Sequence, residues 1–214
     1  MRFLGRVVLV QVQAAPLKVG KRPDAVYDPA PLTRVERVCV TPGGVVGVTA
    51  GGDEILDVHH AAHGETRQNS SGVNGVSVNF SGHYQTLRAR FGGHLTDGCA
   101  GENILVEAAG TFTRADLDAR LVFVNPFVNP ANVAAPVTLS KLTVAAPCVE
   151  FGAWAAAGRE LPGREMRDVL DFLHHGRRGF YATLESPIES DTTPPAFIRP
   201  GDLVYAAAAG PAVP

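Results

Sequence analysis

Short runs of apolar and β-branched residues, separated by frequent glycines and prolines, set the pattern of this chain. The clearest alternation runs through Val137 and Leu139 and resumes after Lys141 with Leu142 and Val144, which is typical of a half-buried strand. Many short strands with turn residues between them predict a mainly β protein, a closed and distorted barrel, rather than alternating β-α units. We expect strands at residues 5–13, 35–40, 73–80, 104–106, 121–124, 137–144, 179–184 and 202–206.

A few peripheral helices are predicted beside the strands. Residues 81–92 place Tyr84 and Leu87 at helical spacing, with Ser81 as the expected N-terminal cap. Residues 162–176 form an apolar stripe that ends in two histidines and a glycine, a common end of a helix.

Composition bounds the class of protein. The 214 residues are 45% hydrophobic and 19% charged, which is enough apolar material for a sizeable core. We interpret residues 1–206 as a single domain and 207–214 as a frayed tail. The net charge of −2 argues against nucleic-acid binding, and no apolar run approaches the length of a membrane-spanning helix. The short apolar stretch at the N-terminus is interpreted as a strand, not a signal peptide.

The three cysteines, Cys39, Cys99 and Cys148, are widely spaced and form no C-x-x-C pair. This usage favours a reduced, cytoplasmic protein over a disulfide framework. Cys148 directly follows Pro147, at the end of the best predicted strand. Because proline cannot donate a ladder hydrogen bond, the strand should stop there and leave the thiol facing a cleft, as a metal ligand or nucleophile. Inert packing is the alternative.

The motif G-E-N-I contains Glu102 and Asn103 just before a predicted strand. Its glycines allow tight turns, and its side chains offer acceptors and an amide donor for a ligand. A turn in which Asn103 bonds its own backbone explains the motif equally well.

Histidines gather in G-G-D-E-I-L-D-V-H-H-A-A-H-G, which spans residues 51–64. If this piece were helical, His59 and His63 would share a face, with His60 beside them, as in some zinc sites. The flanking glycines favour a loop, in which these histidines are solvated. Zinc binding by His59, His60 and His63 is therefore the weaker alternative.

A further candidate is H-H-G-R-R-G-F-Y, in which Arg177 and Arg178 stand between glycines near Tyr181. Guanidinium groups beside exposed backbone suit a phosphate or a carboxylate. Positive charge at a helix C-terminus explains the same arginines without a ligand.

Taken in chain order, these motifs resemble the MOSC domain family, named after the C-terminal part of molybdenum cofactor sulfurase. The order is G-G-D, H-H-x-x-H-G, G-E-N-I, a strand ending in P-C, then G-F-Y and P-G-D. The resemblance runs from about residue 5 to residue 206. Its most specific part is G-E-N-I followed by P-C. It implies a distorted β-barrel with a few helices.

The resemblance also implies a function for Cys148, the cysteine of the P-C motif. Family members either ligate molybdenum in a pyranopterin cofactor through this cysteine, and reduce N-hydroxylated compounds, or carry sulfur on it as a persulfide. The implied partners are the pterin, a sulfur donor such as a cysteine desulfurase, and a redox protein; the family is also associated with pyridoxal phosphate. A non-catalytic binding barrel is a further hypothesis. The residues expected to bind the cofactor are Asp53, Glu102, Asn103, Arg177, Arg178 and Tyr181.

The chain differs from the usual pattern of the family at two places. Ala145 and Ala146 stand before P-C, where a basic residue is common, and Ala182 and Thr183 follow G-F-Y, where an arginine is common. An anionic pterin phosphate needs positive charge or helix N-termini, so other basic residues are candidates to replace the missing ones. The candidates are Lys18, Lys21, Arg22, Arg177 and Arg178.

Overall fold

The computed structural model describes residues 1–65, 75–127, 136–159, 161–185 and 196–208. Seven strands of this part of the chain close into a barrel, because β1 pairs with β14 as well as with β9. All neighbours are antiparallel except β8 and β9, which are parallel. In order around the barrel the strands are β1 (Arg2–Gln13), β14 (Leu203–Ala207), β10 (Arg120–Val124), β11 (Val137–Val144), β12 (Phe180–Leu184), β8 (Val76–Phe80) and β9 (Ile104–Glu107).

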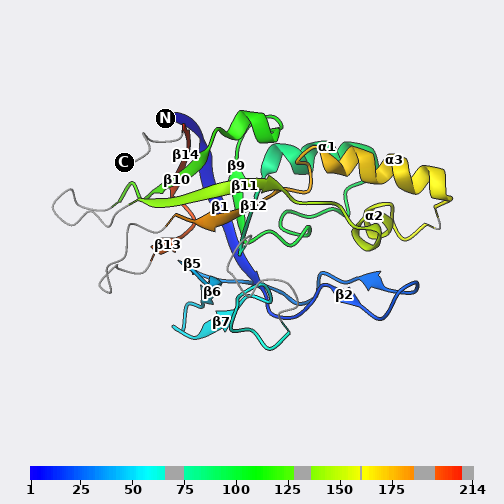
Figure 1. Cartoon of the computed structure of the whole chain (residues 1–214), viewed down its shortest axis with the longest axis horizontal. Helices are drawn as coiled ribbons and strands as arrows, with labels where there is room; N and C mark the ends of the chain where they lie inside the picture. The colour runs from blue at the N-terminus through cyan, green and yellow to red at the C-terminus, as the bar shows by residue number, and fades with distance from the viewer. Residues whose placement is uncertain (66–74, 128–135, 160, 186–195, 209–214) are drawn as a thin grey trace.

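Smaller sheets extend this barrel at one end (Figure 1). A four-stranded antiparallel sheet has the order β13-β5-β6-β7, and β4 continues the barrel sheet beyond β1. A separate hairpin consists of β2 and β3. The bounds are β2 (Lys18–Val19), β3 (Val26–Tyr27), β4 (Leu32–Arg34), β5 (Arg37–Thr41), β6 (Gly44–Val48), β7 (Glu54–Leu56) and β13 (Ala196–Ile198).

The helices gather on one side of the barrel, as Figure 1 shows for α1 (Ser81–Phe91), α2 (Val149–Ala155) and α3 (Gly163–His174). A 3-10 turn, η1, spans Arg114–Leu117. Val10 belongs to the cluster inside the barrel, whereas its neighbour Leu9 packs in a second cluster with Tyr84 of α1 and Phe151 of α2. Successive residues of a strand face opposite sides, so β1 is buried on both faces. The second cluster lies between barrel and helices and positions the candidate site.

A bulge explains the interrupted alternation of β11. Its register with β12 shifts between Ser140 and Thr143, and Lys141 has a positive φ of 51°. The extra residue returns Leu142 to the barrel interior beside Leu139.

The predicted barrel class is confirmed, and each of the eight expected strands overlaps an observed one. The short strands β2, β3, β4, β6, β7 and β13 and the helix α2 were not predicted. The expected serine cap is wrong: Phe80 precedes the first turn of α1, and the Ser81 hydroxyl instead donates to the Ala108 carbonyl. Ala207 belongs to β14 rather than to the predicted tail, of which residues 209–214 lie outside the described part. Among the described helices, none has the length and apolar character needed to cross a bilayer.

Candidate functional site around Cys148

Cys148 stands where β11 gives way to α2. The Ala145 N–H still donates to the Gly179 carbonyl, at 3.0 Å, and the pairing ends before Pro147. Cys148 has extended backbone angles, φ −118° and ψ 156°, and its carbonyl accepts the first helical bond from Gly152, at 2.9 Å. Its side chain is half-buried. The thiol is therefore fixed at a strand-to-helix junction and keeps partial access to solvent.

Arg178 is a cation that interacts electrostatically with this thiol. Burial lowers the pKa of its guanidinium, but Tyr181, Cys148 and Tyr27 together raise it above the ordinary value. A hydrogen bond with Tyr181 contributes to the increase. The Arg178 Nη1 donates to the Ala146 carbonyl at 3.2 Å. The site thus contains one thiol, one guanidinium and two phenol groups that act on one another electrostatically.

The β2–β3 hairpin contributes Tyr27 to this group. Its ring packs edge-on against Phe151, at 5.1 Å between centroids, and lies tilted against Trp154, at 5.4 Å. The Tyr27 hydroxyl donates to the Cys99 carbonyl at 2.7 Å. Burial raises the pKa of this phenol far above its ordinary value, so Tyr27 remains a neutral hydrogen-bond donor.

Two basic residues suggested as phosphate ligands already have a partner. Lys18 and Arg22 approach the carboxylate of Glu150, at 3.5 Å and 3.2 Å. Burial raises the pKa of Glu150, but its own backbone N–H, Lys18, Arg22 and a hydrogen bond with Cys148 outweigh that effect and lower it. The hairpin is therefore tied by ion pairs to the helical turn that follows the candidate thiol.

Glu102 of the G-E-N-I motif is buried close enough to Arg178 for the two charges to interact. Burial raises the pKa of Glu102 to about 7, and the charge of Arg178 acts in the opposite direction. Its Oε2 accepts the Tyr84 hydroxyl at 2.9 Å, whereas Oε1 has no hydrogen-bond partner among the described residues. A carboxyl group with this pKa can hold or release a proton near neutral pH.

Two more buried polar atoms near Arg178 lack a hydrogen-bond partner among the described residues. Arg178 Nε is one of them, and Asn79 Nδ2 is another. Gly179 connects the two, since a Cβ at this glycine would lie 3.3 Å from the Asn79 side chain. Buried polar groups are normally hydrogen-bonded, to protein, water or ligand. Two donors and the Glu102 acceptor therefore offer unused hydrogen bonds around Arg178.

Asn103, by contrast, is fully engaged in the structure of the barrel. Its Nδ2 donates to Asp57 Oδ2 at 2.8 Å, and its Oδ1 accepts the N–H and the hydroxyl of Ser77, at 3.0 and 2.9 Å. Asp57 also accepts the backbone N–H groups of Gln13 and His59, at 2.8 and 2.9 Å. The expected role of Asn103 in a cofactor pocket is not supported, because its amide already ties two segments together.

The histidine segment is a series of turns, as the loop interpretation predicted. His59 bonds Asp57 through Nδ1 at 2.9 Å, His60 bonds Thr41 at 3.2 Å, and His63 accepts the backbone N–H of Glu65 at 3.1 Å. Within the described ranges, no three His, Cys, Asp or Glu side chains are arranged to hold a metal ion. These side chains bind neighbouring groups separately, so the described residues give the zinc alternative no support.

Two other expected ligands lie apart from the thiol. Asp53 is in the exposed turn between β6 and β7, where its backbone N–H donates to the Thr49 hydroxyl at 3.1 Å; that turn and α2 occupy different parts of Figure 1. The Arg177 guanidinium stacks on the ring of Phe172, 4.4 Å from its centre, and donates to the Phe172 carbonyl. The structure thus groups Cys148, Arg178, Tyr181 and Glu102 but separates Asp53, Asn103 and Arg177 from them.

Sequence reasoning missed Tyr27 and Glu150. Neither lies in a recognisable motif, although Glu150 follows Cys148 by two residues and is an acid in the first turn of a helix. Two surface hollows of about 410 and 190 Å³ lie elsewhere and do not include Cys148.

Comparison with known proteins agrees with the architecture. The YUAD protein from Bacillus subtilis superposes with a TM-score of 0.50 at 12% identity, over 94% of this chain and 97% of its own. A structure described as a hypothetical protein superposes with a TM-score of 0.50 at 10% identity, over 97% and 69% of the two chains. These likenesses show the fold alone. No family model matches the chain, and no curated protein matches it in sequence.

Proposed function

We propose that Cys148 is the functional thiolate of this protein and that it ligates molybdenum in a pyranopterin cofactor. One observation carries the proposal: a half-buried thiol shares its surroundings with Arg178, next to buried donors and an acceptor that lack described partners. The order of the motifs, which resembles the MOSC family, supports the same role.

The residues around Cys148 carry the chemical groups that a molybdenum–pyranopterin cofactor requires. A cysteine thiolate is a soft ligand for a thiophilic metal. The Arg178 guanidinium can bind an anionic phosphate, and its charge interacts with Cys148. Asn79 Nδ2 and Glu102 Oε1 provide a donor and an acceptor for a polar heterocycle. A persulfide alone would leave these hydrogen bonds unused.

The cofactor would supply two-electron redox chemistry, and the chain would supply binding and protons. Reduction of an N-hydroxylated compound to the amine consumes two electrons and two protons and releases water. The electrons come from a redox partner. Glu102, with a pKa of about 7, can release a proton toward the site and recover it from solvent. Tyr181 and Arg178 hold the anionic ligand in place.

A sulfur-carrier role is the second candidate, favoured by the charge next to the thiol. A thiolate at Cys148 would attack the outer sulfur of a donor persulfide, forming a new S–S bond and releasing the donor thiol. Arg178 would stabilise the anionic persulfide that results. This reaction needs no metal and no cavity for a pterin.

Metal and pterin content tests the first proposal. We expect the protein purified from cells that make the cofactor to contain molybdenum and pterin in equal amounts. Cys148→Ala should lose the metal, whereas Cys39→Ala is the matched control, because Cys39 is another half-buried thiol in a different sheet. A metal-free wild-type protein, or equal molybdenum in the wild type and Cys148→Ala, contradicts the proposal.

Mass spectrometry tests the sulfur-carrier role separately from metal binding. After incubation with a cysteine desulfurase and cysteine, the wild type and Cys39→Ala should gain one sulfur atom that Cys148→Ala lacks. An unmodified thiol in a metal-free protein would leave Cys148 with neither function.

A further inference from the structure

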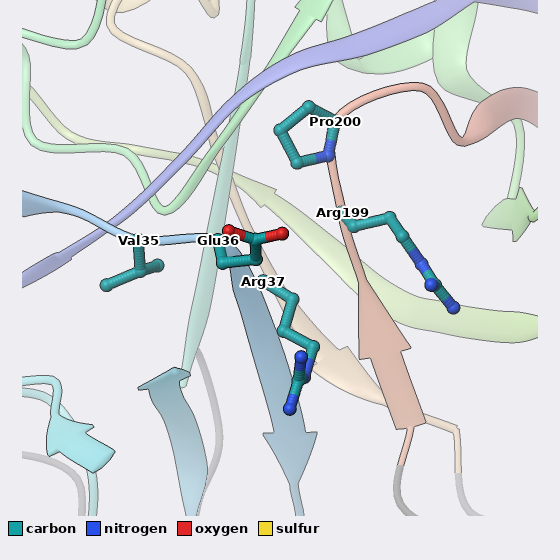
Figure 2. A pocket seen from close by; sticks show the side chains of 5 residues that line it. All are labelled: Val35, Glu36, Arg37, Arg199 and Pro200. Atoms are coloured by element: carbon teal, nitrogen blue, oxygen red, sulfur yellow. The ribbon is translucent and has the colours of Figure 1, made fainter. Parts of the chain in front are cut away.

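An open hollow of about 410 Å³ lies between β5 and the turn that follows β13 (Figure 2). Its lining contains two arginines and one acid among five residues: Val35, Glu36, Arg37, Arg199 and Pro200. Backbone hydrogen bonds from Val35 to Val10 and from Glu36 to Val48 attach this rim to the barrel and to β6. Arg199 and Pro200, the first residue of the P-G-D motif, form the opposite rim.

The two arginines flank the last pair of the β5–β13 ladder. β13 pairs with β5 in antiparallel register, with Phe197 opposite Cys39 and Ile198 opposite Val38. Arg199 follows β13 directly, and continuing the register by one step would place it opposite Arg37. Figure 2 shows both side chains extending away from Val35, from neighbouring segments. Like charges directly opposite each other in a sheet destabilise the pair, so this arrangement calls for a neutralising group.

No described carboxylate lies within ion-pair distance of either guanidinium, although Asp202 lies near enough to Arg199 for their charges to interact. The Arg37 guanidinium lies over the ring of Phe197, 5.1 Å from its centre, and makes no ion pair with a described residue. The Arg199 backbone N–H donates to Asp202 Oδ2 at 3.0 Å, which fixes the turn. Burial raises the pKa of Asp202, and the charge of the Arg199 guanidinium acts in the opposite direction without an ion pair. Glu36 lines the hollow but is not within ion-pair distance of either arginine.

We propose that this hollow is a second ligand site, in which Arg37 and Arg199 together bind the carboxylate or phosphate group of a small anionic molecule. Each guanidinium offers several donors in a planar fork, which suits the oxygens of such a group. The volume is within the range of small-molecule sites. The bound anion relieves the repulsion between the two arginines, and the stacking of Arg37 on Phe197 orients one of them in advance.

Binding of simple anions tests the site directly. Inorganic phosphate and the dicarboxylate malonate are each titrated into the full-length protein by calorimetry at low ionic strength, so that the two ligand chemistries are compared. At least one of them should bind, and Arg37→Gln and Arg199→Gln should each weaken that binding about tenfold or more, as expected for a lost charge-assisted hydrogen bond. Arg164→Gln, an exposed arginine of α3, removes the same charge elsewhere and should leave the affinity within twofold.

Substitution of the acid in the hollow should change the anion affinity in the opposite direction to the arginine substitutions. Glu36→Gln removes the acid of the hollow and should tighten anion binding two- to threefold. Failure of both anions to bind, or equal weakening by Arg164→Gln and Arg199→Gln, overturns the proposal. The Cys148→Ala variant should bind the anion normally, which distinguishes this site from the proposed cofactor site.

Discussion

Glu102 and Asn103 are adjacent in the chain, yet their side chains lie in opposite kinds of surroundings. Asn103 uses its amide fully: both Ser77 groups donate to Oδ1, and Nδ2 donates to Asp57. Glu102 has one carboxylate oxygen bonded to Tyr84, a second without a described partner, and a pKa raised by burial to about 7. A motif that looks uniform in sequence thus divides between a closed polar network and an open polar cluster.

The difference separates a structural role from a chemical one. Complete hydrogen bonding lowers the energy of buried polar groups and makes them rigid. Groups left without partners cost stability, and natural proteins keep them mainly where water, ligand or chemistry uses them. The closed network holds the histidine turns against the barrel, whereas the open cluster surrounds Cys148 and Arg178. Three predictions test this division.

The largest effect is expected for the closed network. Asn103→Ala removes a hydrogen bond from the buried Asp57 carboxylate and leaves the Ser77 N–H without its acceptor. The loss of a buried hydrogen bond to a carboxylate, together with a Ser77 N–H left without an acceptor, should lower the free energy of unfolding by about 4 kcal/mol. Asn125→Ala, which loses only an exposed turn bond to Phe127, should cost less than about 1 kcal/mol. Urea unfolding measures both, and a loss under 1 kcal/mol for Asn103→Ala would show that the network does not hold the fold.

The second effect is a pH dependence specific to Glu102. Its folded pKa of about 7 lies above the ordinary 4.5, so the folded state binds more protons between these values. Its contribution is therefore fully present below pH 4.5 and is lost as the pH rises through 7, by at most about 3 kcal/mol. Glu102→Gln should remove this loss and gain stability relative to the wild type at pH 8.

A second buried group, His83, also makes the stability depend on pH, so the wild type must be compared with Glu102→Gln. Burial lowers its pKa to about 4 from the ordinary 6.5, so its contribution is present above pH 6.5 and is lost as the pH falls through 4. The two groups oppose each other between about pH 4.5 and 6.5, and the wild-type curve alone does not separate them. Denaturant unfolding at several pH values does, since the difference between the wild type and Glu102→Gln contains only the Glu102 effect. A pH-independent difference contradicts the raised pKa.

The sequence predicted what depends on local pattern. Pro147 ends the pairing of β11 and leaves Cys148 at a junction because a proline lacks an N–H, wherever it occurs. The strands of the barrel were found because their β-branched runs are long enough to show a pattern. The strands β2 and β3 were missed because each has two residues, and α2 was missed because seven residues with an internal glycine show no clear period.

What the sequence could not predict depends on contacts between distant residues. The Asp57–Asn103 bond joins residues 46 positions apart, and neither segment alone shows that the amide is already used. Tyr27 reaches the site because a hairpin folds onto α2. The arginine pair was indistinguishable in sequence, but Arg178 lies by Cys148 and Arg177 lies on Phe172. Gly179, with φ 103° and no room for a Cβ beside the Val78 carbonyl, fixes the turn next to them.

The arginine pair, Arg177 and Arg178, supplies the test with the smallest expected effect and the most selective one. A guanidinium stabilises a nearby thiolate, the reactive form of cysteine. Arg178→Gln should therefore slow the alkylation of Cys148 by iodoacetamide about fivefold at neutral pH, an effect of about 1 kcal/mol. Arg177→Gln removes the same charge one residue away and should leave the rate unchanged, although it loses the stacking on Phe172.

Peptide mass spectrometry follows Cys148 separately from Cys39 and Cys99, so the rate refers to one thiol. The alkylation of Cys39, in β5, should be the same in the wild type and in both variants, which excludes a general loosening of the fold. Equal slowing in the two variants would mean that Cys148 responds only to the net charge of the region. Slowing by Arg178→Gln alone would place the functional cation of the open cluster at Arg178, whose charge interacts with Cys148.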